Sequence, residues 1–501
     1  MPLIPSTFPW LSSVLFILLL GAIITLCLPN KLARQAALIS AVLALLVNIV
    51  VVMVFDNTQA GFQLVENYPW IPNLQVNYQL GVDGLSVLFL PFTSLLFLAV
   101  ILASWNAVRH LPSLFFALML FLQLTLQGIF SALDTLLFFL FWELSLLPFF
   151  FLISLWGAGA NRRYAAVKYT LFMMTGGITI LLGLIVLALQ SPEPISFAYT
   201  DLLVLAHHNP WQTMVFFLLL FGFAIKLPLF PFHAWLPVVA QEGPANVVAV
   251  LVGLKVGAYG LLRYVIPLAP EATQQFDWLL IGMSMLGVLY GTLAALSQTN
   301  LRRMLAYASL SHISMVVLGI VSFNQQGLQA AIFQLLNFTL IASGLFIILG
   351  FIHQRIGSTE QLSLGGMASS MPLLATFFLL FGLGSLGLPG TSGFPAEFLL
   401  IMAILQSNLG AGLLVLFSII LTAAYFLTAY RKAFLGEAQH TVIKESPDLK
   451  RRELLIVVLL AFWVLFWGFY PQPLLNSSQV SSAAWLEWTK RQFESPVGLQ
   501  Q

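Results

Sequence analysis

The sequence predicts an all-α polytopic membrane protein with about 14 transmembrane helices, and composition is the first reason. Of its 501 residues, 60% are hydrophobic and only 8% are charged, whereas about a quarter of a soluble domain is charged. The apolar residues also form windows of about 20, the length that crosses a bilayer. These windows are 8–28, 33–55, 85–105, 113–130, 133–156, 165–190, 211–237, 244–266, 277–298, 305–322, 327–352, 372–403, 408–430 and 453–471. The connections between them are too short to fold as soluble domains.

The distribution of Lys and Arg predicts how the helices cross the membrane. Fourteen of these residues lie in the odd-numbered connections and their flanks, whereas the even-numbered connections and both termini contain only Arg263, Lys490 and Arg491. Cytoplasmic connections carry the excess of basic residues, so this bias predicts an even number of spans. We therefore expect both termini on the lumenal, non-cytoplasmic side.

Two of the windows are interrupted by proline and glycine. Phe221–Pro237 contains three prolines, and Phe377–Leu400 contains Pro389 and Pro395 within a glycine-rich stretch. A helix broken at membrane depth is tolerated only where protein or a water-filled cavity surrounds it. Numbering the windows as spans 1 to 14, the breaks fall in spans 7 and 12. Two breaks at comparable positions indicate two inverted repeats of five helices, spans 4–8 and 9–13. The predicted domains are 1–112 (N-terminal helices), 113–270 (first repeat), 271–435 (second repeat) and 436–501 (last helix and tail).

Glu143 and Lys226 are the first pair of candidate functional residues. Glu143 lies inside an apolar window with no neighbouring charge in the sequence, so its carboxylate must find a partner, take up a proton or face water. Lys226, beside the first break, is its natural partner. A Lys–Glu pair of adjustable separation could hold and release a proton, which would make it a proton switch. The alternatives are a static buried salt bridge and an ion pair that only holds helices together.

Three further ionisable residues lie in or beside apolar windows. Lys255 is in the middle of its window among glycines, which leave room for water, and its alternative role is a lysine that extends to the interface. Glu397 follows the second break and could exchange a proton there, or it could cap the restarting half-helix. Lys168 lies nearer the end of its span, where an interfacial basic residue is the alternative.

Two histidines could carry protons near neutral pH. His312 and His233 both lie in or beside the windows that hold the charged residues, although each could be a hydrogen-bonded structural histidine. The chain has a single cysteine, Cys27, which cannot bind an iron–sulfur cluster or form a Cys-ligated zinc site. No glycine loop for phosphates and no dinucleotide fingerprint is present. We expect no cofactor, no metal and no redox centre in this chain, and no nucleic-acid partner.

Five motifs together resemble the antiporter-like subunits of complex I, the NAD(P)H–quinone oxidoreductase, over nearly the whole chain. They are FFLFWELSLLPFFFLISLWG, AIKLPLFPFHAWLP, GLKVGAYGLLRY, NLRRMLAYASLSHIS and LPGTSGFPAEFLL. The chain is most similar to the subunit 4 (M) type, because Glu397 stands where the other types usually have lysine.

The resemblance assigns roles to the candidate residues. It implies that Glu143 and Lys226 form the family's glutamate–lysine pair, that Lys255 is its central lysine and that Glu397 is its exit-side acid. Lys168 matches a lysine that links to the neighbouring channel or to its own pair. His312 matches a histidine near the central lysine.

The connection LVENYPWIPNLQVNYQLGVDGLSV is similar to cyanobacterial and chloroplast versions, whose donor is reduced ferredoxin and whose acceptor is plastoquinone. The resemblance thus implies a proton-translocating membrane-arm subunit of a photosynthetic complex I in the thylakoid membrane. Its partners would be lipids and the subunit 5-type and subunit 2-type chains. Plastoquinone and iron–sulfur clusters would belong to other subunits.

Two departures from the family pattern suggest a specialised paralogue. Val238–Ala240 replaces a typical Asp-Ala-His, and Asn337 replaces a histidine. An amide cannot shuttle a proton as imidazole does, so the central path would be routed differently or be less conductive. Specialised copies of this subunit belong to CO2-uptake complexes, which would add a carbonic-anhydrase-like partner. The alternatives are a subunit of a multisubunit sodium/proton antiporter and a structural arm subunit that does not pump.

Overall fold

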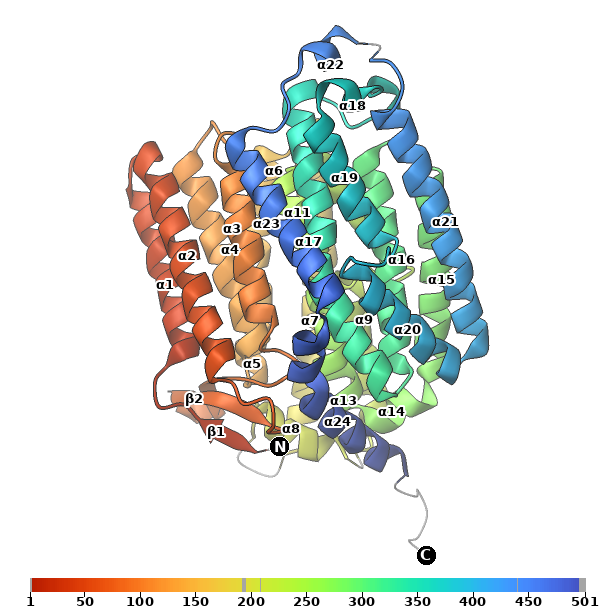
Figure 1. The fold of residues 1–501 in the computed structure, drawn as a ribbon. Coiled ribbons are helices and arrows are strands. Elements are labelled where there is room, and N and C mark those ends of the chain that lie inside the picture. Colours follow the sequence, from red (N-terminus) through yellow and green to blue (C-terminus); the bar gives the residue numbers. More distant parts are fainter. Residues whose placement is uncertain (1, 192–194, 208, 439, 495–501) are drawn as a thin grey trace, which may run out of the picture.

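The computed structural model describes residues 2–191, 195–207, 209–438 and 440–494, and it is a bundle of long helices (Figure 1). Helices or helix segments occupy all fourteen predicted windows. They are α1 (Trp10–Cys27), α2 (Asn30–Val54), α3 (Phe89–Ser104), α4 (Pro112–Ser131), α5 (Thr135–Leu144), α6 (Leu146–Trp156), α7 (Arg162–Ala188), α9 (Gln212–Lys226), α10 (Leu236–Glu242), α11 (Ala245–Gly253), α12 (Val256–Gly260), the π-helix η2 (Leu261–Val265), α13 (Ile266–Leu268), α15 (Asp277–Leu296), α16 (Leu301–Val321), α17 (Gln325–Ile356), α19 (Pro372–Ser385), α20 (Gly393–Ser407), α21 (Leu409–Phe434) and α23 (Arg451–Phe469).

Eleven helices of the described residues are long and apolar enough to cross a membrane. The predicted polytopic helical fold is therefore confirmed, while the count of fourteen crossings, the inverted repeats and the domain limits stay predictions. The central helices α16 and α17 are almost wholly buried, whereas α1 and α2 expose large apolar residues on the outside of the bundle. Small residues let the outer helices approach closely: Ala33, Ala37, Ala41 and Ala44 form a fully buried stripe along α2.

The helix breaks fall where prolines and glycines accumulate. Between α9 and α10, residues 227–235 form turns, and between α19 and α20 residues 386–392 do the same, which confirms the two predicted breaks. A third break was not predicted: Leu254 and Lys255 separate α11 from α12. A smaller interruption at Ser145 separates α5 from α6. Pro148 explains it, because a proline cannot donate a hydrogen bond to the carbonyl four residues earlier.

The expectation of a wholly helical chain needs one correction. A three-stranded sheet combines β1 (Leu3–Pro5), which precedes α1, with β2 (Phe62–Ile71) and β3 (Val76–Val82) from the connection after α2, in the order β1-β2-β3. β1 pairs parallel to β2, and β2 pairs antiparallel to β3 with Tyr68 opposite Tyr78. This connection closes as a hairpin because the one-turn helix η1 (Pro72–Leu74) ends at Gln75 in the left-handed conformation.

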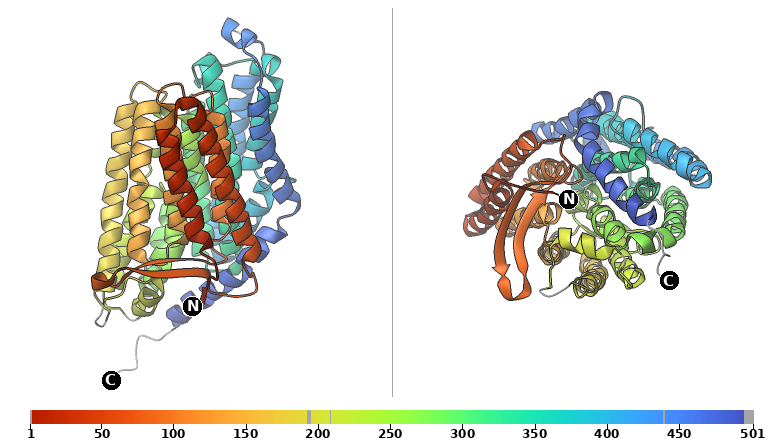
Figure 2. Two further views of the ribbon diagram at one scale, coloured as in Figure 1. Left: turned by 90° about the vertical axis from the view of Figure 1, so that its left-hand side faces the viewer. Right: turned by 90° about the horizontal axis from the view of Figure 1, so that it is seen from below.

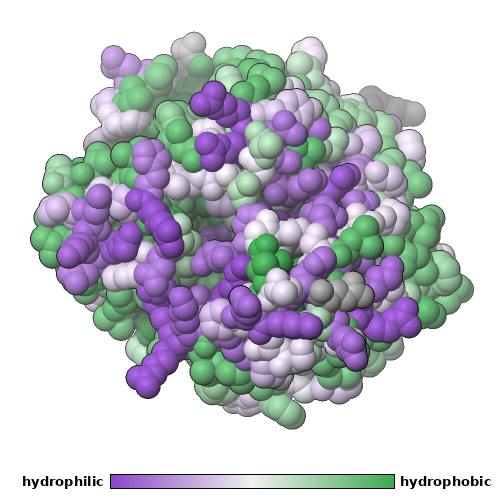
Figure 3. All heavy atoms as spheres, turned by 90° about the horizontal axis from the view of Figure 1, so that it is seen from above, coloured by the Kyte–Doolittle hydropathy of each residue, from purple (hydrophilic) through white to green (hydrophobic). Residues whose placement is uncertain are grey.

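The segment predicted to be a tail after the last span is also structured. It forms α24 (Gln472–Glu494), which lies across the same end of the bundle as the sheet (Figures 1 and 2). Both described ends of the chain thus lie on one side, as an even number of crossings requires. Four short helices complete the connections: α8 (Tyr199–Ala206), α14 (Pro270–Gln275), α18 (Met367–Ser370) and α22 (Thr441–Glu445), with a further turn η3 (Gln361–Ser363). Figure 3 shows hydrophilic residues gathered over the opposite end, which α18 and α22 cover.

Candidate proton path

The first break brings Lys226 close to the end of α5. Lys226 is the last residue of α9, and its Nζ donates to Ser145 Oγ at 3.1 Å. The same ammonium lies 3.8 Å from the centre of the Trp142 ring, within cation–π distance. Trp142 lies in the last turn of α5, and Ser145 is the interruption between α5 and α6. The Pro148 interruption thus positions a hydroxyl for the lysine that ends the next broken helix.

Glu143 lies beside this site without closing on the lysine. Among the described residues, Glu143 and Lys226 form no ion pair, and Glu143 Oε1 is buried without a hydrogen-bond partner. The carboxyl group occupies the space that a Cβ on Gly177 of α7 would need. The Trp142 Nε1 and Tyr169 hydroxyl groups are also buried without a partner in the described structure. Orphaned polar groups at this depth are usually satisfied by water.

Lys255 occupies the unpredicted break in span 8. Its side chain is 4% exposed, and its Nζ donates to Ser309 of α16. The nearest aromatic face is Phe338 of α17, whose ring centre is 5.7 Å from Nζ. No acidic side chain of the described residues pairs with this ammonium. Burying a lysine with only neutral partners is costly, and such residues in membrane helices are functional candidates.

The second break carries a connected set of polar side chains. Glu397 of α20 is buried, lies 3.6 Å from His312 Nδ1 and accepts from Gln334 Nε2 at 3.3 Å. Asn337 Nδ2 donates to Gln334 Oε1 at 3.0 Å, and Ser392, at the start of the restarting half-helix, donates to Asn337. Asn337 therefore connects Ser392, at the break, to Gln334, which in turn contacts the Glu397 carboxylate.

A small cavity joins Lys255 to this set. Its volume is about 40 Å³, which is room for at least one water molecule. Ser309, the partner of Lys255, lines it together with His312, Gln334 and Asn337. We use the name second-break path for the series Lys255, Ser309, cavity, His312 and Glu397.

The structure does not bring the two remaining candidates into this path. His233 lies between α9 and α10 against Tyr290 and Phe230, with ring centres 4.9 and 5.7 Å away, and its Nδ1 has no partner among the described residues. Lys168 is partly exposed on α7, with its Nζ 5.8 Å from the Tyr164 ring. Neither contacts another candidate residue. Val238–Ala240, which replaces the usual Asp-Ala-His, lies in α10, where Val238 is half-buried and Val239 and Ala240 are fully buried.

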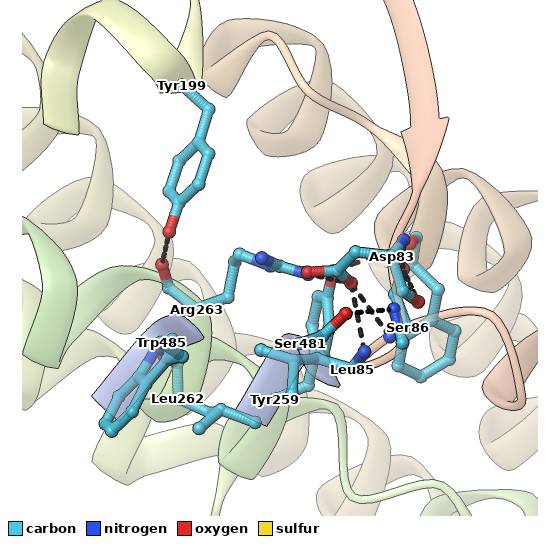
Figure 4. Close-up of polar contacts among 11 residues, drawn as sticks. Asp83, Leu85, Ser86, Tyr199, Tyr259, Leu262, Arg263, Ser481 and Trp485 are labelled. Atoms are coloured by element: carbon cyan, nitrogen blue, oxygen red, sulfur yellow. Dashed lines mark hydrogen bonds and ion pairs between the residues drawn. The ribbon is translucent and has the colours of Figure 1, made fainter. Parts of the chain in front are cut away.

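Sequence reasoning also missed several polar partners. Ser309 and Gln334 gave no signal, because serine and glutamine are common inside helices. A buried ion pair between Asp83 and Arg263 was missed as well, since Arg263 was assigned to a connection (Figure 4). Its signal was available: Arg263 stands inside the apolar motif GLLRY. In the described part of the chain, no group of three or more His, Cys, Asp or Glu could hold a metal ion.

A helical bundle with ionisable side chains buried at helix breaks defines the class of ion-translocating membrane subunits. The comparisons narrow this class. The family model described as "NADH:quinone oxidoreductase/Mrp antiporter, TM" matches residues 132–422, more than half of the chain. The chain therefore belongs to this family and is an integral multi-pass membrane protein.

Relatives of known name support the same assignment. NADH-quinone oxidoreductase subunit M of Rickettsia typhi is 36% identical over 456 residues, covering 90% of this chain and 92% of that protein. NAD(P)H-quinone oxidoreductase chain 4 1 of Synechococcus elongatus is 35% identical over 490 residues, covering 95% and 91%. The resemblance to the subunit 4 (M) type is thus confirmed.

Solved structures share the fold over nearly the whole chain. A chain of respiratory complex I from Thermus thermophilus with bound NADH superimposes with a TM-score of 0.88 at 30% identity, covering 96% of this chain and 99% of that one. A chain of the Mrp complex from Dietzia has a TM-score of 0.83 at 22% identity, covering 96% and 98%. The Dietzia likeness shows the fold alone.

Proposed function

We propose that this chain translocates protons as a membrane-arm subunit of a complex I-type quinone oxidoreductase. The observation that carries the proposal is the second-break path. Lys255 and Glu397, two buried ionisable groups, are linked there by a hydroxyl, a cavity and an imidazole in an otherwise apolar bundle. Every group in the series can donate, pass or accept a proton. The relation to subunit M of NADH-quinone oxidoreductases supports the same function.

The path works as a relay from lysine to carboxylate. The Lys255 ammonium donates to the Ser309 hydroxyl, which can pass its own proton to water in the adjoining cavity. His312 lines the same cavity and accepts the proton. Its Nδ1 needs only a short approach from 3.6 Å to reach Glu397. Glu397 is then the terminal acceptor, held in place by Gln334.

The first break supplies the switch. Lys226 donates a hydrogen bond to the neutral Ser145 hydroxyl, and Glu143 forms no ion pair among the described residues. Approach of the carboxylate would stabilise the ammonium, and withdrawal would favour release of its proton, because the attraction between opposite charges is strong away from water. Quinone reduction in another subunit would drive this approach. Lys168 and His233 would serve only as auxiliary groups, since neither contacts the path.

The test is to neutralise the switch. Lys226→Met and Glu143→Gln should each abolish proton translocation in membrane vesicles while the assembled complex still forms. Quinone reduction and proton uptake are measured on the same vesicles, and assembly is followed by native electrophoresis. Undiminished translocation by a correctly assembled variant would refute the function.

We infer that the parent complex is photosynthetic, with ferredoxin as donor, plastoquinone as acceptor and both termini in the thylakoid lumen. The support is the likeness of residues 64–87 to cyanobacterial versions and the Synechococcus relative. Asn337 and Val238–Ala240 extend the proposal to a CO2-uptake paralogue. Affinity purification tests it: a carbonic-anhydrase-like chain beside subunit 5-type and subunit 2-type chains supports the paralogue, and peripheral NADH-oxidising subunits contradict it.

A second candidate function is sodium/proton antiport, because the description of the matching family model also names the Mrp antiporter. Imposed sodium gradients separate the two. An antiporter subunit responds with proton movement in the absence of quinone turnover. The proposed proton pump does not respond to sodium.

A further inference from the structure

The lower half of span 8, the eighth predicted window, consists of α12, η2 and α13. Contacts with other parts of the chain must hold it in position. The break at Leu254 and Lys255 separates α12, η2 and α13 from α11, so no continuous helix fixes their register. Lys255 immediately precedes α12. Any shift of this half along its axis therefore moves the origin of the second-break path.

A buried ion pair fastens this half near its far end. Arg263 of η2 pairs with Asp83, which follows β3, and both side chains are 3% exposed (Figure 4). The Asp83 carboxylate is itself fixed, because it accepts from the backbone N–H groups of Leu85 at 3.2 Å and Ser86 at 3.1 Å. The guanidinium carbon also lies 5.0 Å from the centre of the Phe62 ring. The Asp83 carboxylate and the Phe62 ring thus both contact the guanidinium group and hold it in place.

The π-helix provides two more attachment points. Its wider turn changes the usual helical hydrogen bonding, and two of its carbonyl groups accept from side chains of other elements. Trp485 of α24 donates to the Leu262 carbonyl at 3.1 Å, and Tyr199 of α8 donates to the Arg263 carbonyl at 2.7 Å. The backbone of Gly84, beside Asp83, donates in turn to Ser481 of α24 at 2.9 Å. The helix α24 therefore contacts the residue next to each member of the ion pair, Leu262 beside Arg263 and Gly84 beside Asp83.

The other end of this half presses against the first break. A Cβ on Gly257 would collide with the backbone of Leu227, the residue after Lys226. A Cβ on Gly260 would collide with the Phe223 ring of α9. The helix α12 is consequently packed directly against the residue that follows one lysine while it begins at the other. A single short helix links the environments of Lys226 and Lys255.

We propose that Asp83 and Arg263 are positioning residues that set the register of α12 between the two lysines, with α24 as their support. This rests on the proposed function of Lys255 as a proton relay. Removing the charge of Asp83 leaves a buried guanidinium without a counter-ion. The lower half of span 8 then has to move to hydrate it. The displacement would part Lys255 from Ser309.

Asp83→Asn tests the proposal, with Glu453→Gln as the matched control. Glu453 forms the other buried acid–arginine pair of the described residues, with Arg355, and it joins α23 to α17 without involving α12 or η2. The number of protons moved per quinone reduced, in equal amounts of assembled complex, should fall about 2- to 30-fold in Asp83→Asn. It should stay at the parental value in Glu453→Gln. Trp485→Phe and Tyr199→Phe, which remove one hydrogen bond each, should lose less than Asp83→Asn.

The pH profile of translocation distinguishes positioning from plain destabilisation. If Lys255 is displaced, the groups around its ammonium change, and these groups set the pH at which it releases a proton. The pH midpoint of translocation in Asp83→Asn should therefore move from the parental value. A superimposable profile with unchanged coupling would overturn the proposal. Lys255→Met is measured in parallel. If Lys255→Met also pumps normally, the proposed function itself fails. If only Asp83→Asn pumps normally, the positioning role fails alone.

Discussion

Two of the three helix breaks, the one after α9 and the one between α11 and α12, place the same two residue types in different surroundings. At each break a lysine donates to a serine hydroxyl: Lys226 to Ser145 and Lys255 to Ser309. Near Lys226, Glu143 Oε1, Trp142 Nε1 and the Tyr169 hydroxyl are buried without a hydrogen-bond partner among the described residues, and the Trp142 ring lies beside the ammonium. Beside Lys255 the serine lines a cavity, and two other residues of its lining, His312 and Gln334, contact Glu397. This difference is the basis of our proposal that one region switches and the other conducts.

The largest effect should come from the ends of the conducting region. Lys255→Met and Glu397→Gln each remove a proton-carrying group from the second-break path, so proton translocation should fall at least about 100-fold, in the range lost with a general acid or base. Proton uptake by vesicles, normalised to assembled complex, measures it. If either variant keeps translocating at the parental rate, the path does not run through that residue.

Matched serine variants would sharpen the comparison. Ser309→Ala leaves Lys255 without its hydroxyl and interrupts the link to the cavity, so translocation should fall about 10-fold or more. Ser145→Ala removes the same bond from Lys226 but leaves the Trp142 ring and a nearby carboxylate, so a loss of about 2- to 5-fold is expected. Equal losses in the two variants would mean that the regions do not differ in role.

A smaller effect is expected at Asn337. Asn337→Ala removes the bridge between Ser392 and Gln334, which orients Glu397, and should slow translocation about 2- to 10-fold. Asn337→His can make both bonds and should keep the parental rate or exceed it. A slow histidine variant beside a normal alanine variant would place the conducting route elsewhere.

The smallest transport effect should come from Gly177→Ala. The added Cβ meets the Glu143 carboxyl group, and such overpacking costs about 1–3 kcal/mol of stability. Thermal unfolding in detergent measures that cost. The carboxylate can move aside, so translocation should change by less than about 2-fold. A complete loss of translocation would show that the separation of Glu143 from Lys226 is fixed rather than adjustable.

Isolated charges in apolar windows were the features that the sequence revealed best. Glu143, Lys226, Lys255 and Glu397 could each be found alone, because a buried charge needs no partner to stand out. The broken spans 7 and 12 were equally visible through their prolines. The break at Lys255 was missed because its glycines are also compatible with a continuous helix. The sheet was missed because Pro69 lies inside β2 and that strand does not alternate clearly.

The links between the charges could not be read from the sequence. Ser309 becomes significant only when α16 places it beside a lysine 54 residues away. The same is true of Asn337, which is 55 residues from Ser392 and was expected to weaken the path rather than connect it. Such links depend on which helices are neighbours, and the apolar periodicity of a wholly buried helix carries no information about its neighbours.

The Asp83–Arg263 pair has a consequence for biogenesis. Its members are 180 residues apart, and Ser481 follows Gly84 by 397 residues. A chain made from its N-terminus inserts its first helices long before Arg263 is synthesised. Asp83 therefore has no arginine partner until Arg263 has been made, and the contact of Gly84 with α24 forms only after Ser481 has been made. Products truncated before Arg263 would therefore carry an unpaired aspartate that quality control could recognise.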